Sequence, residues 1–330
     1  MQRIALKLAL VLALAVVPGA ASALDILLTN DDGQSAPGIQ AMRTALCNAG
    51  HQVTLVGPAT DQSGRGGSIN TGALSSSSAM SLTRVSSDAC GAQYSLAAPT
   101  VPGRFGGTPV DALKAGLDVV LAGSPPDLIV SGLNRGQNLG KPTSNSSGTV
   151  GAALQGAFDG IPAIAGSVGI LASENPTFGT TIAAFPPAAD FIVRLIAALE
   201  ARARHGNLLP KGVKLLNVNF PVPYGDITGF EITKLADRSE LELPLYDRSV
   251  GFPPLAPPAA TPDCATLVDG ASCSLGVGFV QVEGPDEVRH ADTDAFAEGL
   301  ISITPMDGDM TVRNPIYSHS LFAILHRLTP

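Results

Sequence analysis

The chain has 330 residues, of which 45% are hydrophobic and 15% are charged. This apolar content is sufficient for a globular core and excludes an intrinsically disordered chain. Twenty basic and 28 acidic residues give a net charge of −8, which argues against a nucleic-acid duplex or an anionic membrane as the main partner.

The N-terminal segment has the three parts of a secretory signal peptide. Arg3 and Lys7 precede an apolar run at residues 8–17, and the small residues Ala21-Ser22-Ala23 follow. The run is shorter than the roughly 20 residues that a membrane span requires, and we expect no later segment to be long and apolar enough. A buried first helix or a membrane anchor is the alternative. We predict that residues 1–23 are cleaved after Ala23, and that the mature protein is exported to the periplasm or secreted, without a membrane partner.

Strand-like and helix-like patterns alternate in the next part of the chain. A β-prone run at 24–29 ends in Asn30-Asp31-Asp32-Gly33, a helix begins at Pro37, and a strand covers 51–56. The Ser- and Gly-rich stretch at 61–87 predicts an exposed loop or a weak hairpin. Helices are then predicted from 108, from 150 and around 188–199, and strands at 127–131, 162–167 and 214–220. Such alternation predicts an α/β fold whose mostly parallel sheet is covered by helices on both faces.

The pattern changes after residue 227. Short strands and a Pro-rich segment at 252–262 precede a predicted strand at 299–304 and a predicted helix at 317–328. We therefore predict a core over 24–227, followed by a C-terminal extension over 228–330. The extension would carry a β-hairpin, elements for oligomerisation, the Pro-rich loop and the terminal helix.

The four cysteines form no CxxC motif, so neither a zinc site nor a thioredoxin-like site is predicted. In an oxidising compartment, disulfides are the expected state of an even set. We predict that Cys264 pairs with Cys273 and Cys47 with Cys90, which is one of three connectivities. Buried free thiols are the alternative.

Polar clusters follow the predicted strands, where ligands bind in open parallel sheets. Asp31 and Asp32 end the first strand, Ser63 follows the second, and Asn134 follows the third. Adjacent carboxylates repel each other unless a proton or a cation lies between them, and a hard divalent cation with oxygen ligands removes this conflict. A serine hydroxyl and an asparagine amide oxygen suit the same coordination shell. Ordinary turns at these positions are the alternative.

A second cluster suits an anion. Ser147-Gly148-Thr149 offers hydroxyls and backbone N–H groups at a helix N-terminus, and Asn138 adds an amide donor. Simple helix capping by the same residues is the alternative. The motifs of serine hydrolases, P-loop NTPases and dinucleotide dehydrogenases are absent from the sequence, which removes the usual support for those classes.

As an ordered set, these strings resemble the SurE family of stationary-phase survival proteins, which are metal-dependent nucleoside monophosphate phosphatases. The resemblance is carried by motifs at 26–33, 36–39, 61–64, 107–111, 131–140, 147–150, 216–221 and 292–299. It implies a Rossmann-like three-layer αβα core with a smaller C-terminal β-rich region. The leader, the stretch at 141–146 and the Pro-rich segment depart from the common pattern of the family.

The resemblance also implies a function and a set of site residues. Asp31, Asp32, Ser63 and Asn134 match the metal ligands of the family, and Asn138 with the 147–149 turn (Ser147, Gly148 and Thr149) matches its phosphate-binding region. The implied reaction is hydrolysis of nucleoside 5′- and 3′-monophosphates with one Mg²⁺ or Mn²⁺ per subunit, in a homodimer or homotetramer. Asp31 and Asp32 are the catalytic candidates, each as metal ligand, proton acceptor or both.

Two other functions stay open at this point. An exported broad-specificity acid phosphatase would use the same metal site without selecting a nucleoside. A non-enzymatic periplasmic protein would bind an anion or a metal ion there without turnover.

Overall fold

The computed structural model describes residues 23–70, 79–98, 107–203, 207–239, 241–242, 245–247, 273, 275–277, 280–281 and 284–309. Five predictions lie wholly or partly outside these residues: the leader, the loop or weak hairpin at 61–87, the Pro-rich segment at 252–262, the pairing of Cys264 and the terminal helix at 317–328.

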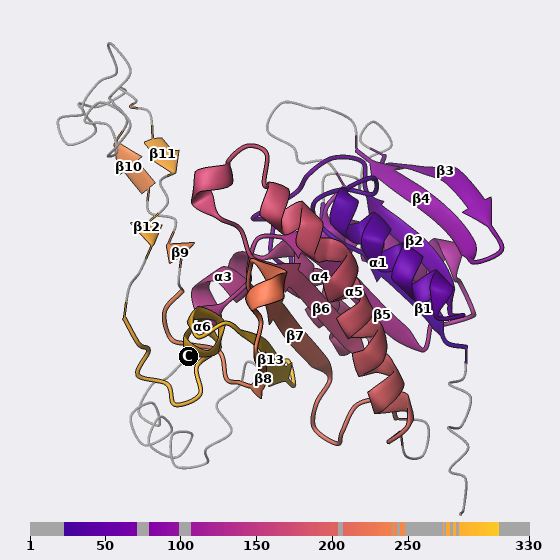
Figure 1. The fold of residues 1–330 in the computed structure, drawn as a ribbon. Helices are drawn as coiled ribbons and strands as arrows, with labels where there is room; N and C mark the ends of the chain where they lie inside the picture. Colours follow the sequence, from indigo (N-terminus) through magenta and orange to yellow (C-terminus); the bar gives the residue numbers. More distant parts are fainter. Residues whose placement is uncertain are drawn as a thin grey trace, which may run out of the picture.

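A nine-stranded sheet forms the centre of the molecule (Figure 1). Its strands are β1 (Asp25–Thr29), β2 (Gln52–Pro58), β3 (Ser81–Asp88), β4 (Gly91–Ala97), β5 (Leu128–Arg135), β6 (Ala163–Val168), β7 (Leu215–Phe220), β8 (Gly229–Ile232) and β13 (Leu300–Met306). Their spatial order is β3-β4-β2-β1-β5-β6-β7-β13-β8. Every neighbouring pair is parallel except β3–β4 and β7–β13. The predicted mostly parallel sheet is confirmed.

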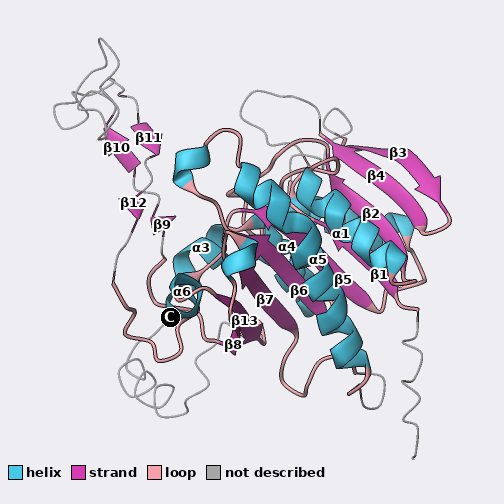
Figure 2. Cartoon of the chain, viewed as in Figure 1, coloured by secondary structure: helices cyan, strands magenta, loops and turns pink. Residues whose placement is uncertain are grey.

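Helices cover both faces of this sheet, as Figure 2 shows. The helix α1 (Pro37–Asn48) packs with α5 (Gly179–Glu200) on one face, and α2 (Pro109–Ala115) packs with α4 (Gly148–Phe158) on the other. The shorter helices are α3 (Gly140–Ser146), η3 (Gly116–Val120), η4 (Ala172–Glu174), η5 (Tyr224–Asp226) and α6 (Asp292–Ala297). The three-layer αβα arrangement that the family resemblance implies is therefore present.

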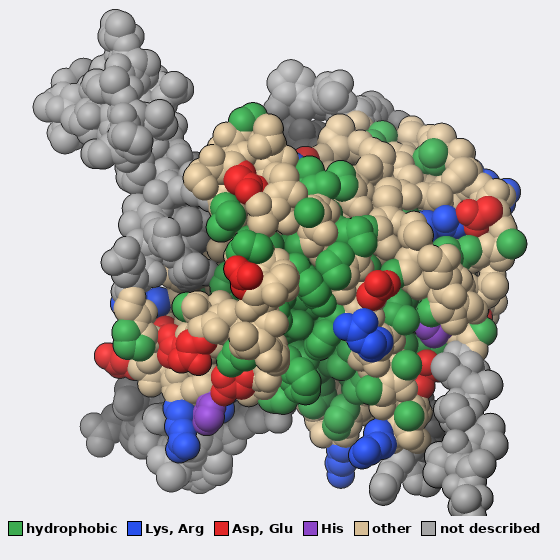
Figure 3. All heavy atoms as spheres, viewed as in Figure 1, with side chains coloured by type: hydrophobic (Ala, Val, Ile, Leu, Met, Phe, Trp, Pro, Cys, Tyr) green, Lys and Arg blue, Asp and Glu red, His purple; other side chains and the backbone are tan. Residues whose placement is uncertain are grey.

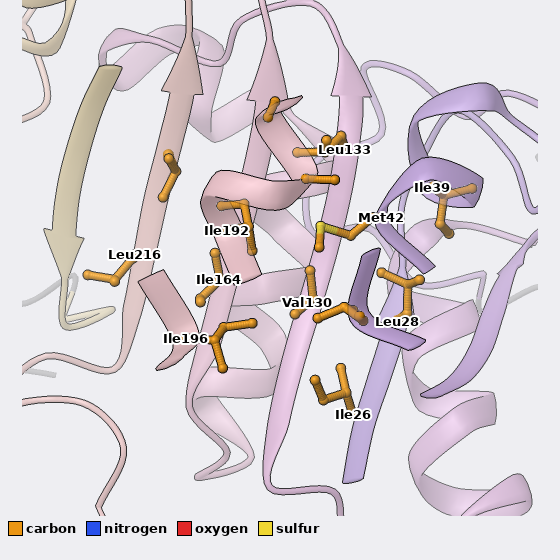
Figure 4. Packing of buried hydrophobic residues seen from close by; sticks show 14 of the residues in the cluster. Ile26, Leu28, Ile39, Met42, Val130, Leu133, Ile164, Ile192, Ile196 and Leu216 are labelled. Atoms are coloured by element: carbon orange, nitrogen blue, oxygen red, sulfur yellow. The ribbon is translucent and has the colours of Figure 1, made fainter. Parts of the chain in front are cut away.

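Strand β1 contributes side chains to the hydrophobic layers on both faces of the sheet. Ile26 and Leu28 point to one face, where they pack with Met42 of α1 and Ile192 of α5 (Figure 4). Leu27 points to the other face and packs in the layer that α2 and α4 cover. Successive side chains of a strand point to opposite faces, so a strand with both faces buried is apolar throughout.

The predicted start of α2 is confirmed in detail. Thr108 Oγ1 accepts a hydrogen bond from the Asp111 N–H at 3.0 Å, and Asp111 Oδ2 accepts one from the Thr108 N–H at 2.9 Å. This reciprocal pair is a capping box, with Pro109 at the first helical position. The π-helical segment η3, which contains Leu117, follows directly after α2.

Three elements differ from the sequence-based expectation. Strand β4 and helix α3 were not predicted. Helix α5 begins earlier than expected and runs through Pro186 and Pro187. It also corrects the expectation that no later segment is apolar and long enough to span a membrane, because α5 meets that test by length and composition. Seven of its 22 residues are buried against the rest of the protein.

The outer side of α5 borders an apolar groove. Figure 3 shows hydrophobic side chains gathered across the centre of the face on which Figure 1 places α5. The groove has a volume of about 450 Å³ and lies between α5 and the strands β8 and β13. Phe230 and Ile232 of β8 are 60% and 59% exposed beside it.

A disulfide joins Cys47 at the end of α1 to Cys90 in the β3–β4 turn, with the Cα atoms 5.6 Å apart. This is the predicted partnership for these two cysteines. The ion pair between Arg43 of α1 and Asp88, at 2.7 Å, lies on the same side and ties the same two segments. The ion pair of the buried Arg43 and the adjacent disulfide together hold the β3–β4 hairpin against α1.

The region after residue 227 contributes to the sheet and to a separate antiparallel arm. Strands β8 and β13 both pair within the main sheet. Beyond them, β9 (Leu241–Glu242) pairs with β12 (Val280–Gln281), and β10 (Leu245–Asp247) pairs with β11 (Leu275–Val277). The predicted C-terminal β-rich region is therefore confirmed.

Candidate active site

The ends of neighbouring strands bring Asp32 and Asn134 together. Strands β1 and β5 run parallel with Thr29 opposite Ser131, and Asp32 and Asn134 lie equally far beyond this pair. The backbone N–H of Arg135 donates to Asp32 Oδ2 at 2.8 Å, which fixes one oxygen of that carboxylate. The two segments that sequence analysis selected from different strands thus meet at the carboxyl edge of the sheet.

Asp31 faces the N-terminus of α4 and is 3% exposed. Its Oδ1 accepts a hydrogen bond from Thr149 Oγ1 at 2.6 Å. Gly148 allows this approach, since a Cβ at that position would lie 2.8 Å from Asp31 Cβ. The positive end of the helix dipole therefore lies beside a buried carboxylate, which it stabilises in the charged form.

Ser63 belongs to a loop that is attached to Asp31 through the backbone. The Gln62 N–H donates to the Asp31 carbonyl oxygen at 2.7 Å. The Ser63 N–H donates to Asp61 Oδ1 at 2.8 Å, and the Ser63 side chain is exposed. The structure therefore places the Ser63 loop beside the aspartate pair.

The electrostatics of the aspartate pair disfavour two negative charges. Burial raises the pKa of Asp31, against the opposing effect of its hydrogen bond from Thr149. Burial, and next the charge of Asp31, raise the pKa of Asp32 to about 7. Asp61 adds to both increases. A proton or a cation between these groups would relieve the repulsion.

Several oxygen atoms at this edge are shielded from solvent and have no hydrogen-bond partner among the described residues. They are Asp32 Oδ1, Asn134 Oδ1 and Asn30 Oδ1. Carboxylate and amide oxygens are the ligands that Mg²⁺ and Mn²⁺ prefer. The described residues contain no group of three or more His, Cys, Asp or Glu that could hold a metal ion, so a cation here would need these neutral oxygens as well. The donor set fits a hard divalent cation.

Asn138 is anchored by a buried amide network. Its N–H donates to Asn219 Oδ1 at 2.7 Å, its Nδ2 donates to Ser167 Oγ at 2.8 Å, and its carbonyl accepts from Asn217 Nδ2 at 2.8 Å. The side chain that was predicted to contact phosphate is thus tied to β6, and the loop after β5 is fixed to β6 and β7.

The hydroxyls of the 147–149 turn are both used within the protein. Ser147 Oγ accepts from the Val150 N–H at 3.1 Å, so Ser147 is the N-cap of α4. The Thr149 hydroxyl is held by Asp31. The capping alternative from sequence analysis describes the geometry of Ser147, while Thr149 lies within the carboxylate site.

Sequence reasoning gave no role to three contributors to this site, and it chose Gly148 for phosphate binding without its close approach to Asp31. Asn30 and Asp61 stand within motifs that were quoted but were given no role. The backbone of Arg135 and the close approach of Gly148 could not be read from spacing. For Asn30 a signal was available, because an amide side chain directly before two acids at a strand end is an additional oxygen donor.

Comparison with known proteins adds independent support. Residues 26–242 match the family model described as survival protein SurE. The 5′-nucleotidase SurE of Thermosynechococcus vestitus is 36% identical over 87% of this chain and 91% of its own length. That of Thermosipho africanus is 33% identical over 87% of this chain and 93% of its own length.

A solved structure also supports the likeness to SurE proteins. The crystal structure of the SurE protein from Aquifex aeolicus is 27% identical and superposes with a TM-score of 0.63, over 91% of this chain and 98% of that chain. The matches extend over the sheet and over the segments that form the carboxylate site. The chain therefore belongs to the SurE family.

Proposed function

We propose that this protein is a 5′-nucleotidase, a phosphoric monoester hydrolase that converts nucleoside 5′-monophosphates, and also 3′-monophosphates, to nucleoside and phosphate. The proposal includes one Mg²⁺ or Mn²⁺ per subunit. The observation that carries it is the pair of repelling carboxylates at the end of β1, of which Asp31 is buried and Asp32 is half-buried, together with oxygen atoms beside them that have no partner among the described residues. Relatives of similar length that are named 5′-nucleotidase SurE support the same reaction.

Asp31, Asp32, Ser63 and Asn134 would hold the cation. When bound, a divalent cation neutralises charge on the phosphate and makes a water molecule more acidic. Thr149 holds Asp31 in one orientation through its hydroxyl, and the Arg135 N–H does the same for Asp32. Each aspartate therefore keeps one fixed oxygen and presents the other to the site.

The proton of the attacking water would pass to a carboxylate oxygen of Asp31 or Asp32 that does not contact the cation. The phosphate would lie at the N-terminus of α4, beside Ser147, Gly148 and Thr149, with Asn138 fixing the adjacent loop.

Location and assembly are further parts of the proposal. The leader-like residues 1–23 support export to the periplasm or secretion after cleavage. The Cys47–Cys90 disulfide fits an oxidising compartment. The family likeness supports a homodimer or homotetramer, which sedimentation of the mature protein would test.

The test is phosphate release by the purified mature protein from 5′-AMP, 3′-AMP and p-nitrophenyl phosphate, with added Mn²⁺ or Mg²⁺ and with a chelator. We expect hydrolysis of both nucleotides that the chelator abolishes and the cation restores. Equal or faster hydrolysis of p-nitrophenyl phosphate would indicate a broad-specificity phosphatase instead. Absence of phosphate release from all three with cation present would refute an enzymatic role and leave a binding protein.

A further inference from the structure

An arginine–aromatic pair lies at the edge of the carboxylate site. The guanidinium carbon of Arg135 is 5.2 Å from the centre of the Phe178 ring, within the range of a cation–π contact. The backbone N–H of the same Arg135 holds Asp32. The backbone of Arg135 therefore contacts a carboxylate that we place in the reaction, while its side chain contacts Phe178. The Arg135 side chain is 44% exposed.

The arginine is fixed on its other side by an acid. Arg135 Nη2 lies 3.5 Å from Asp61 Oδ2, and Asp61 belongs to the loop whose Gln62 N–H bonds to Asp31. The guanidinium thus bridges the loops after β2 and β6. An arginine that is already paired with a carboxylate is a poorer partner for a doubly charged phosphate, but its planar face remains suited to stacking.

The aromatic residue is held in an unfavourable backbone conformation. Phe178 has φ +48°, in the left-handed region that bulky residues rarely adopt. The Phe178 N–H donates to the Glu174 carbonyl oxygen at 3.0 Å, and the Thr180 N–H donates to Glu174 Oε2 at 2.8 Å. Such strain persists only where surrounding contacts impose it, and it is concentrated at ligand sites. The hydrogen-bonded turn at the start of α5 therefore fixes the position of the Phe178 ring.

We propose that Arg135 and Phe178 form the platform on which the nucleobase of the substrate stacks. The proposal rests on the function proposed above, because it assumes that a nucleotide places its phosphate at the aspartate pair. A base lies one sugar away from the phosphate, and the platform adjoins the carboxylates because the backbone N–H of Arg135 bonds to Asp32. Stacking on an aromatic ring and a guanidinium tolerates every base, since every base has a π face. The pair selects nucleotides over other phosphomonoesters and takes no part in the chemical step.

The test compares two substrates that differ only in the base. We would measure kcat and KM for 5′-AMP and for ribose 5-phosphate with the cation-loaded wild type, Phe178→Ala and Phe178→Tyr. Phe178→Ala is expected to lower the ratio of kcat/KM values for the two substrates at least tenfold, mainly through the KM for 5′-AMP. Phe178→Tyr, which keeps a ring, is expected to restore the ratio.

Arginine variants supply the matched control. Arg135→Ala is expected to lower the same ratio. Arg194 contacts the Phe191 ring at 5.7 Å on α5 and lines the apolar groove, and Arg194→Ala is expected to leave the ratio unchanged. If Arg135→Ala reduces hydrolysis of both substrates equally, the arginine acts on the phosphate and the platform is refuted. An unchanged ratio in Phe178→Ala refutes it as well.

A binding measurement separates this proposal from the proposed function. Should the wild type hydrolyse neither substrate, the nucleotidase assignment fails, and adenosine titrated into the wild type and Phe178→Ala by NMR decides the platform alone. Adenosine binding that weakens at least tenfold in Phe178→Ala supports a base site. Absent binding, or equal binding by the two proteins, overturns it.

Discussion

Replacing Gly148 by alanine tests whether α4 is fitted closely against Asp31. A Cβ at this position would lie 2.8 Å from Asp31 Cβ, 2.8 Å from Pro109 Cγ and 3.0 Å from Asp31 Oδ2. Carbon atoms that are not bonded prefer a separation of about 3.5–4.0 Å. The N-terminus of α4 or the Asp31 side chain must therefore move by about 1 Å. A proline ring and a buried carboxylate cannot yield as the tip of a flexible side chain would.

The expected effect on stability follows from this overpacking. An extra methyl group in a filled site costs about 1–3 kcal/mol, and the better helix propensity of alanine recovers less than about 1 kcal/mol. We expect Gly148→Ala to lower the free energy of unfolding by about 1–2 kcal/mol. The effect on turnover is larger, because a 1 Å displacement of a reacting group costs about 100-fold in rate. Urea unfolding followed by circular dichroism and hydrolysis of 5′-AMP measure the two effects.

Gly225→Ala is the matched control. Its Cβ would meet no atom within 4 Å. We expect this variant to unfold within about 0.5 kcal/mol of the wild type and to keep its activity. If Gly148→Ala unfolds and turns over like Gly225→Ala, the close approach of α4 to Asp31 is not a feature of the molecule in solution, and the geometry on which the site depends is refuted.

Three further predictions concern the aspartate pair and the disulfide. Asp32→Ala is expected to abolish phosphate release without lowering the free energy of unfolding, because a repelling carboxylate is removed; near-normal turnover would contradict the role of Asp32. With the cation removed by a chelator, Asp32 keeps its proton up to about pH 7 in the folded state but loses it near pH 4 in the unfolded state. The free energy of unfolding should therefore fall as the pH rises from 4 to 7, by at most about 4 kcal/mol. Urea titrations at pH 4 to 8 measure this slope, and a slope of the same size in Asp32→Asn would show that another group causes it. Replacing Cys47 and Cys90 by serine opens a loop with a sequence separation of 43 and should lower the free energy of unfolding by about 4 kcal/mol. Urea unfolding of the wild type and the double variant, with and without reductant, measures this loss. If reductant destabilises the double variant as much as the wild type, the disulfide is not the cause.

The order of the core elements could be predicted because local patterns and tertiary structure agree there. Thr108, Pro109 and Asp111 specify a capping box within four residues, and the box forms. The apolar residues of β1 specify a strand with both faces buried, and helices cover both. In such segments the period of hydrophobic residues and the capping chemistry are sufficient.

The missed elements depend on partners that are distant in sequence. Helix α3 begins at Gly140 and contains Pro142, so its own propensity is poor. It is held by the Gly140 N–H bond to Asp292 Oδ2 at 3.0 Å, across 152 residues, and by the Lys141 N–H bond to the Ala236 carbonyl. Strand β4 has mostly half-buried residues and is fixed by pairing between β2 and β3. Pairing of this kind overrides weak local preference.

In the candidate site, too, some features follow from local sequence and others depend on contacts between distant segments. Asp31, Asp32 and Asn134 could be selected because the carboxyl ends of parallel strands share one edge of the sheet. The bond from Thr149 to Asp31 joins residues 118 apart, and the bond from Arg135 to Asp32 joins residues 103 apart. Chemistry at strand ends is visible in sequence, whereas the groups that orient it come from other segments and become visible only in the fold.

The placement of the aspartates links metal binding to folding. Burial raises the pKa of both carboxyls, so the pair destabilises the folded protein at neutral pH when no cation is present. The same low-polarity surroundings strengthen the attraction between these carboxylates and a cation. The interlocked hydrophobic layers on both faces of β1 are therefore needed to hold the pair together before a cation arrives. Ligand that binds only the folded state stabilises it by RT ln(1 + [L]/Kd), so a hundredfold excess of Mn²⁺ over its Kd should add about 2.7 kcal/mol to the free energy of unfolding, and this gain should vanish in Asp32→Ala.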